Sequence, residues 1–288
     1  AETAGTDTES TKEASSENIC FFDEEVHKKK EFENFIESNM QQALDSQCFE
    51  MVLQPKMDLK TNSVIAAEAL VRWRLEDGTY LPPSSFVDIF EKNRFCSKLD
   101  FYMLKKAIQQ IRKWIDMGMN PVNISVNQSK IVFYHENYIS EIKSLLEEYN
   151  VSGSYITLEV LESTVIEDID MFNSILTEVK KLGFSVSLDD FGSGYSSLNV
   201  LSKLQIDELK IDRIFLHTKS EVDNQRTKWI LESIIDIAKK SQILVVVEGV
   251  ESKQDDLFIK NLGADIGQGY FYGRPLSISA FNDLIETK

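Results

Sequence analysis

The stretch Phe184-Ser-Val-Ser-Leu-Asp-Asp-Phe-Gly-Ser-Gly-Tyr-Ser-Ser-Leu198 contains a short strand pattern that ends in two adjacent aspartates. Phe184, Val186 and Leu188 alternate with serines, as in a half-buried strand. Asp189 and Asp190 follow at the end of the strand, where glycines allow a tight turn. Two neighbouring carboxylates repel each other unless a cation relieves the repulsion. A loop aspartate before a helix cap is the alternative, but an apolar strand ending in a carboxylate recurs along the chain.

Strand-like and helix-like segments alternate on both sides of this stretch. Period-two patterns predict strands at 51–54, 64–71, 122–126, 156–160, 185–188, 208–211, 244–247 and 264–266. Helical spacing of apolar residues predicts helices at 99–117, 138–149, 168–182, 228–240 and 253–262. Eight strands with interleaved helices in roughly 240 residues predict an α/β fold of the (β/α)8 TIM-barrel type. A doubly wound open sheet is the alternative, because periodicity does not show whether a sheet closes.

The N-terminal part of the chain has a different composition. Residues 1–19 are rich in Ala, Glu, Thr and Ser and too poor in large apolar side chains to offset chain entropy, which predicts a disordered tail. Phe32, Phe35, Ile36 and Met40 recur at helical spacing, which predicts an amphipathic linker helix at residues 20–46. The main domain is then expected at residues 47–288.

The charge balance limits the classes of partner that the chain can bind. The net charge is −16, from 31 Lys and Arg against 47 Asp and Glu, which argues against binding to duplex nucleic acid or anionic lipid. The apolar run at 243–247 is too short to span a bilayer, and no signal-peptide pattern is present. We therefore expect no membrane segment and a cytoplasmic location, either free or as the cytoplasmic part of a membrane-anchored protein. The three cysteines form no Cys-x-x-Cys pair, which argues against a zinc site.

Polar residues recur at the ends of the predicted strands. In a barrel, the C-terminal ends of the strands converge on one face. The set includes five carboxylates, two amides and one lysine: Glu68, Asn123, Glu159, Asp189, Asp190, Lys210, Glu248 and Gln268. Each could be an ordinary salt-bridged group by itself. Together they supply hard oxygen donors, which suit Mg²⁺ or Mn²⁺ rather than zinc.

Seven blocks of sequence contain these polar residues and span about residues 48–280. The blocks are Leu53-Gln-Pro55 with Glu68-Ala-Leu-Val-Arg-Trp73, Val122-Asn-Ile-Ser125, Leu158-Glu-Val-Leu-Glu-Ser163, Leu188-Asp-Asp-Phe-Gly-Ser-Gly-Tyr-Ser-Ser-Leu198, Leu209-Lys-Ile-Asp-Arg213, Val247-Glu-Gly-Val-Glu251 and Gly267-Gln-Gly-Tyr270. In order and spacing, these blocks resemble the motifs of EAL-domain cyclic di-GMP phosphodiesterases.

The resemblance implies a (β/α)8-like barrel whose first strand is antiparallel to its neighbours, with a role for each matching residue. The implied ligands of two divalent metal ions are Glu68, Asn123, Glu159, Asp189, Asp190 and Glu248. The implied catalytic residues are Lys210, Glu248 and Glu251. The implied substrate-binding residues are Gln54, Leu70, Arg72, Asn127 and Gln268. Glu162 would anchor the loop after Asp190, and Leu161 stands where the family usually has threonine, which removes a hydroxyl near that anchor. A local helix-cap or salt-bridge role for Glu162 is the alternative.

The implied activity is hydrolysis of cyclic di-GMP to linear 5′-pGpG with two Mg²⁺ or Mn²⁺ ions. The alternatives are a cyclic di-GMP receptor without hydrolysis and a dimerisation or docking module. The family also implies a homodimer. The segment Ile19-Cys-Phe-Phe-Asp23 with the charged helix after it resembles the connection between a GGDEF and an EAL domain, which suggests part of a larger signalling protein.

Overall fold

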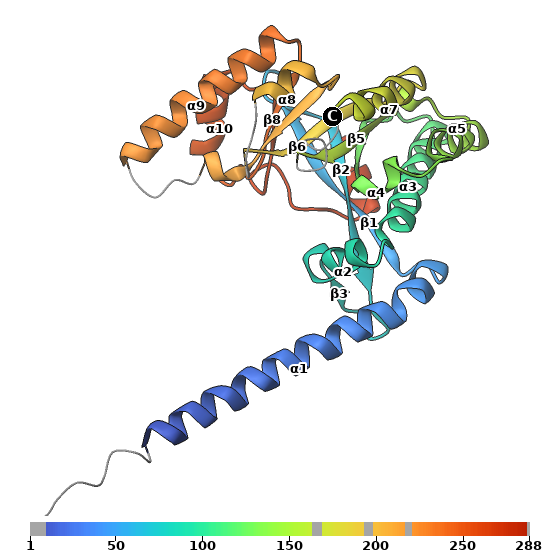
Figure 1. Cartoon of the computed structure of the whole chain (residues 1–288). Helices are drawn as coiled ribbons and strands as arrows, with labels where there is room; N and C mark the ends of the chain where they lie inside the picture. The colour runs from blue at the N-terminus through green and yellow to red at the C-terminus, as the bar shows by residue number, and fades with distance from the viewer. Residues whose placement is uncertain (1–9, 163–168, 193–197, 217–220, 287–288) are drawn as a thin grey trace, which may run out of the picture.

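The computed structural model describes residues 10–162, 169–192, 198–216 and 221–286, and its centre is a closed barrel of eight strands (Figure 1). The barrel strands are β1 (Phe49–Asp58), β2 (Ser63–Arg74), β4 (Asn123–Gln128), β5 (Ile156–Leu161), β6 (Ser185–Phe191), β7 (Glu208–Ile211), β8 (Leu244–Val247) and β9 (Ile266–Gln268). A two-residue strand, β3 (Tyr80–Leu81), pairs with the end of β2. The predicted barrel is therefore confirmed, and the open sheet is not formed.

Closure depends on β1, which is antiparallel to both of its neighbours, β2 and β9. The other neighbouring barrel strands pair in parallel. The antiparallel direction follows from a tight turn between β1 and β2. Asp58 Oδ1 accepts hydrogen bonds from Lys60 N at 2.9 Å and Thr61 N at 2.6 Å, while Asn62 takes the left-handed conformation at φ 54°. The turn brings the start of β1 to the barrel end where β2 finishes.

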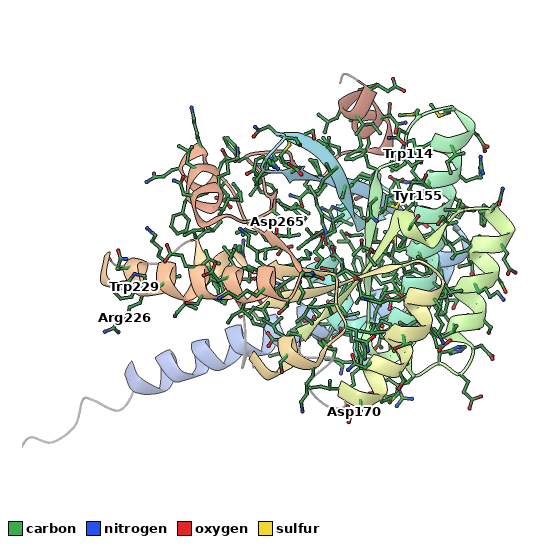
Figure 2. All side chains as sticks on the ribbon, turned by 90° about the horizontal axis from the view of Figure 1, so that it is seen from above. Trp114, Tyr155, Asp170, Arg226, Trp229 and Asp265 are labelled. Carbon is green, nitrogen blue, oxygen red and sulfur yellow. The ribbon has the colours of Figure 1, made fainter. Side chains whose placement is uncertain are left out.

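Helices surround the barrel and cover its outer face (Figures 1 and 2). They are α2 (Val87–Lys92), α3 (Cys96–Asp116), α4 (Lys130–Phe133), α5 (Tyr138–Tyr149), α7 (Ile169–Lys181), α8 (Leu198–Lys203), α9 (Glu221–Lys240), α10 (Lys253–Leu262) and α11 (Ile278–Glu286). Trp114 of α3 lies next to α11, where its Nε1 donates to Asn282 Oδ1 at 2.7 Å (Figure 2). Trp229 of α9 points away from the barrel and is 59% exposed.

The apolar core lies between the barrel and these helices, while much of the barrel interior is polar. Alternate residues of the parallel strands, such as Val126, Leu158 and Leu188, are buried in the apolar core. The residues between them point into the barrel, and several are polar or charged: Lys56, Ser125, Thr157, Glu159, Ser187, Glu208 and Lys210. TIM-barrel interiors are usually filled by branched apolar side chains. The charged side chains inside this barrel therefore need oppositely charged or hydrogen-bonding partners within the barrel.

The N-terminal helix α1 (Ser10–Asp45) differs from the expectation. It begins at Ser10 and not near residue 20, so the predicted disorder of residues 10–19 is replaced by helix, while residues 1–9 lie outside the described part. Glu, Lys and Ala favour helix even where no apolar face is buried. In the C-terminal half of α1, Ile36 and Ala43 are buried and the helix packs against α2, whereas its N-terminal half projects away (Figure 1). Among the described residues, no helix has both the length and the apolar character needed to cross a membrane.

Candidate active site

Four carboxylates converge on one buried lysine at the C-terminal ends of the parallel strands. We call this group the Lys210 cluster: Lys210 with Glu68, Glu159, Asp189 and Glu248. Lys210 Nζ lies 2.7 Å from Glu248 Oε1, 2.8 Å from Glu159 Oε2, 3.0 Å from Asp189 Oδ1 and 3.4 Å from Glu68 Oε2. Lys210 is only 1% exposed. Its five members come from five different parts of the barrel, so the cluster exists only after closure.

Two amide side chains orient Glu68, which occupies the middle of β2. Asn127 Nδ2 donates to Glu68 Oε1 at 3.0 Å, and Gln268 Nε2 donates to Glu68 Oε2 at 2.6 Å. The other amide atom of Gln268, Oε1, is buried without a hydrogen-bond partner among the described residues. A buried acceptor without a donor is costly, which makes Gln268 Oε1 a candidate contact for a bound group.

Asn123, an expected metal ligand, is not brought to this site. It is the first residue of β4, where its Nδ2 donates to Ser154 O at 3.3 Å and its Oδ1 accepts from Thr157 Oγ1 at 2.9 Å. Asn127, four residues later on the same inner face, reaches Glu68 instead. At about 3.3 Å per residue, the two asparagines are separated by about 13 Å along the strand. The expectation for Asn123 is therefore corrected: the amide near the cluster belongs to Asn127.

Asp189, Asp190 and Glu248 form the acidic mouth of the cluster. Their ligand oxygens all lie within 4.8 Å of one another. Asp190 takes a left-handed backbone conformation at φ 57°, and its backbone N–H donates to Asp189 Oδ1 at 2.8 Å. This turn directs two consecutive carboxylates to the same opening, although neighbouring side chains of a strand normally point to opposite faces. Three hard oxygen ligands at such separations suit a divalent cation of the Mg²⁺ or Mn²⁺ class.

The pKa values of these carboxylates reflect an excess of acid over base. Burial raises the pKa of Glu68 and of Asp189, and it raises the pKa of Glu248 to about 8 despite the contact with Lys210. Glu159 is the exception, because Lys210 and Lys56 together outweigh its burial and lower its pKa to about 2. One lysine therefore leaves part of the negative charge of the cluster uncompensated, which favours an added cation.

The cluster faces a cavity of about 340 Å³. Its lining includes two of the five expected substrate-binding residues, Gln54 and Gln268. The full set of lining residues is Gln54, Glu68, Asp189, Asp190, Lys210, Arg213, Glu248, Gly249, Glu251, Gln268, Gly269 and Tyr270. Gln54 Nε2 donates to Gly273 O at 3.3 Å across the opening. Glu251 is exposed at the edge of the cavity. A polar cavity of this kind can hold a small charged ligand against the acidic mouth.

Three expected substrate-binding residues, Leu70, Arg72 and Asn127, do not line this cavity. Arg72 turns its guanidinium back, so that NH1 donates to Val71 O at 2.8 Å. Leu70 lines a second, more apolar cavity of about 260 Å³, together with Asn127 and Leu161. Asn127 thus lies between the second cavity and the Lys210 cluster.

The expected loop anchor, Glu162, lies beneath the turn after Asp190. It is buried, and its Oε2 accepts a hydrogen bond from Gly192 N at 3.4 Å. Gly192 has φ 98°, and a Cβ there would lie 2.2 Å from the Phe215 ring, so only glycine fits this turn without strain. Residues 193–197 of the loop lie outside the described part of the chain, as does any effect of Leu161 on them.

Sequence reasoning missed two charged residues inside the barrel, Lys56 and Glu208. Lys56 Nζ lies 2.7 Å from Glu159 Oε1 and 2.9 Å from Glu208 Oε1, and Lys56 is 0% exposed. A signal was available, because each lies two residues from an expected site residue, Gln54 and Lys210, on the same strand. Period-two alternation could therefore have assigned both to the inner face.

Known proteins resemble this chain in sequence and in fold. Residues 37–275 match the family model described as EAL domain. The chain is 31% identical over 265 residues to a bifunctional diguanylate cyclase/cyclic di-GMP phosphodiesterase, MucR, of Pseudomonas aeruginosa, which covers 92% of this chain and 38% of MucR. It is 32% identical over 282 residues to the cyclic di-GMP phosphodiesterase NbdA of the same organism, which covers 98% of this chain and 36% of NbdA. The chain thus spans well under half the length of these relatives.

A solved structure described as the PaMucR phosphodiesterase in complex with c-di-GMP has the same fold. Its TM-score is 0.79 at 32% sequence identity, and the match covers 85% of this chain and 99% of that chain. The EAL enzyme Bd1971, in a form with cAMP and cyclic di-GMP bound, matches with a TM-score of 0.80 at 28% identity, covering 91% of this chain and 70% of that chain. With the family match over most of its length, the chain belongs to the EAL domain family.

Proposed function

We propose that this chain hydrolyses cyclic di-GMP, opening one of its two phosphodiester bonds to give linear 5′-pGpG. The observation that carries the proposal is the Lys210 cluster, in which four carboxylates surround one lysine at the wall of a polar cavity. A site so rich in carboxylates repels a phosphodiester unless cations reverse the local field. The names of the relatives MucR and NbdA support the choice of substrate.

The three carboxylates of the acidic mouth fit one divalent ion, and we assign a further ion to the deeper carboxylates. Glu68, Asn127, Glu159 and Asp189 would hold one ion, with Asn127 in the place expected for Asn123. Asp189, Asp190 and Glu248, whose ligand oxygens lie within 4.8 Å of one another, would hold the second. Bound Mg²⁺ or Mn²⁺ supplies a nucleophilic water of lowered pKa and neutralises charge on the phosphoryl oxygens.

Lys210 and Glu248 have different roles in the proposed reaction, Lys210 as a fixed positive charge and Glu248 as a proton acceptor. The surrounding carboxylates outweigh burial and raise the pKa of Lys210, so this lysine stays protonated and acts as a fixed cation that orients its partners. Glu248 lies at the cavity and has a pKa raised to about 8, mainly by burial. Once a bound cation keeps Glu248 ionised, its carboxylate is suited to accept a proton from the attacking water. Gln54, Gln268 and Glu251 would position the substrate from the cavity wall.

The test is incubation of the purified chain with cyclic di-GMP and Mn²⁺ or Mg²⁺, with separation of the linear product. We expect turnover that EDTA abolishes and that added Mn²⁺ restores. Binding of cyclic di-GMP without a linear product would replace hydrolysis by a receptor function, and absence of both would favour a docking module. Sedimentation of the same sample measures the homodimer, which stays a prediction.

Glu68→Ala tests the assignment of the site. Glu68 contacts Lys210, Asn127 and Gln268 but contributes little to the apolar core, so the variant should fold. We expect turnover to fall by more than about 100-fold, the upper range for losing a group that merely supports a metal ligand. Glu178→Ala is the matched control, because Glu178 pairs with Lys181 on the surface of α7. Equal turnover of Glu68→Ala and Glu178→Ala would overturn the assignment.

A further inference from the structure

Lys56 lies one layer deeper in the barrel than Lys210 and has three acceptors. Its Nζ donates to Ser125 Oγ at 2.7 Å, to Glu159 Oε1 at 2.7 Å and to Glu208 Oε1 at 2.9 Å. An ammonium group has three protons, so every donor of Lys56 is used. We call this group the Lys56 cluster: Lys56, Ser125, Glu159 and Glu208. Its members come from β1, β4, β5 and β7, and it therefore reaches across the barrel.

Glu159 is the carboxylate that connects the two clusters. Its Oε1 accepts from Lys56 at 2.7 Å, and its Oε2 accepts from Lys210 at 2.8 Å. The side chain of Glu159 is 0% exposed. A buried carboxylate held at each oxygen by a different lysine cannot rotate without breaking an ionic bond. Lys56 itself does not line the cavity beside Lys210, so it is out of reach of a ligand there.

We propose that Lys56 is a positioning residue of this site, which holds Glu159 Oε1 so that Oε2 stays directed at the Lys210 cluster. The inference rests on the proposed function, because it assigns Glu159 to the metal-binding set. Without Lys56, both oxygens of Glu159 would have only Lys210 as an ionic partner. The carboxylate would then turn to engage Lys210 with both oxygens, and its ligand oxygen would no longer be available to a metal ion.

A purely structural role is the competing explanation, because a buried ion pair that loses one partner destabilises a fold. The cluster offers a way to separate the two roles. The contact of Lys56 with Glu159 lies on the side of the Lys210 cluster. Its contact with Glu208 of β7 lies deeper in the barrel than Lys210. Glu208 does not line the cavity beside the Lys210 cluster. Loss of the Glu208 charge weakens the fold but leaves the contact between Lys56 and Glu159 in place.

The experiment measures Mn²⁺ binding to the full chain without substrate, from the free Mn²⁺ signal in electron paramagnetic resonance. Thermal unfolding and the kcat and KM for cyclic di-GMP are measured on the same samples. For Lys56→Met we expect Mn²⁺ affinity to fall by about 10–100-fold, as when a hydrogen-bonded supporter of a metal ligand is lost. The kcat should fall with it, while KM stays near the wild-type value. For Glu208→Gln, the matched control, we expect a lower Tm with Mn²⁺ affinity unchanged.

Each outcome decides between the roles. Wild-type Mn²⁺ affinity in a folded Lys56→Met variant would overturn the inference, whatever its Tm. If Lys56→Met does not fold, the double variant Lys56→Met with Glu208→Leu replaces the buried pair by apolar groups, a change that proteins often tolerate. The same Mn²⁺ titration of the double variant then decides. A wild-type chain that binds Mn²⁺ but forms no linear product would overturn the proposed hydrolysis and leave the Mn²⁺ comparison valid.

Discussion

Two buried lysines share one carboxylate inside this barrel, yet they differ in what they face. Lys210 is 1% exposed and lines a cavity of about 340 Å³, whereas Lys56 is 0% exposed and lies below that cavity. Lys210 has four carboxylate partners, and the acid around it exceeds the base. Lys56 has two carboxylates and a hydroxyl, which match its three protons. The same kind of ion pair can thus face a ligand cavity at one level of a barrel, while one layer deeper all its charges are paired within the protein.

The difference teaches that charge alone does not identify a site. An internally satisfied cluster has no capacity left for a ligand, whereas the Lys210 cluster has uncompensated acid next to an opening. The pKa values express the same contrast. Glu248 at the opening has a pKa raised to about 8, while Glu159 between the two lysines has a pKa lowered to about 2.

The largest expected effect comes from removing the lysine of the open cluster. In Lys210→Ala, four buried or half-buried carboxylates lose their common partner. Breaking a buried ion pair in this way costs about 3–5 kcal/mol of unfolding free energy, and we expect turnover to be lost as well. Urea unfolding with and without Mn²⁺ checks the prediction, because a divalent ion should return part of the stability.

Lys180→Ala provides the control for that measurement. Lys180 pairs with Asp207 at 2.8 Å in a partly exposed position, and such pairs contribute about 0–1 kcal/mol. Equal stability losses in the two variants, or no gain from Mn²⁺ in Lys210→Ala, would contradict the view that the open cluster lacks positive charge.

The next effect compares two asparagines on the same inner face of β4. Asn127 donates to Glu68 at the cavity end, while Asn123 contacts Thr157 and Ser154 at the opposite end. We expect Asn127→Ala to lower turnover by at least about 10–100-fold, because Asn127 both orients Glu68 and is assigned to a metal ion. Asn123→Ala should keep its turnover and lose about 1 kcal/mol of stability from the hydrogen bond to Thr157. Steady-state kinetics of both variants checks this, and the reverse result would return the metal-binding amide to Asn123.

The last comparison concerns Asp100 of α3, a half-buried acid that has no lysine or arginine partner among the described residues. Burial raises its pKa to about 7, although Ser129 N and Oγ donate hydrogen bonds to its Oδ2. The unfolded value is about 3.9, so the folded state binds the extra proton between about pH 4 and pH 7. The stability from this group is therefore complete below about pH 4 and lost as the pH rises to about 7, by up to about 1.4 kcal/mol per pH unit.

Asp100→Asn removes this titration and should flatten the decline in unfolding free energy between about pH 4 and pH 7. Urea unfolding at several pH values measures the slope. Glu159, with a pKa near 2, has the opposite sign, because its contribution is present above about pH 4 and falls only in acid. If the slope of unfolding free energy against pH is the same in Asp100→Asn as in the wild type, the prediction is wrong. The difference between acids with and without a lysine partner would then not affect the stability of the fold.

Much of the fold was predictable from local pattern. The eight barrel strands lie at or next to their predicted positions, since alternation and flanking turns are local properties of the chain. The start of α1 was not predicted, because helix formation there follows intrinsic propensity rather than burial of an apolar face. Glu68, Asp189, Lys210 and Glu248 were predicted from their places in the motifs and do meet. Asn123 was misplaced because the segment Val-Asn-Ile-Ser-Val-Asn offers two asparagines with the same alternation.

The sequence by itself determined the family, the strand order and which side chains can point into the barrel. Only the tertiary structure decided at which level along the barrel axis each inward side chain lies, which carboxylates share a lysine and which lysine faces a cavity. The physical reason is that the alternation of apolar and polar residues shows which face of a strand each side chain occupies. It does not show which residue of the neighbouring strand lies opposite. Register is set by hydrogen bonds between strands, many of which are far apart in the chain, as in the pairing of Lys56 with Gln268.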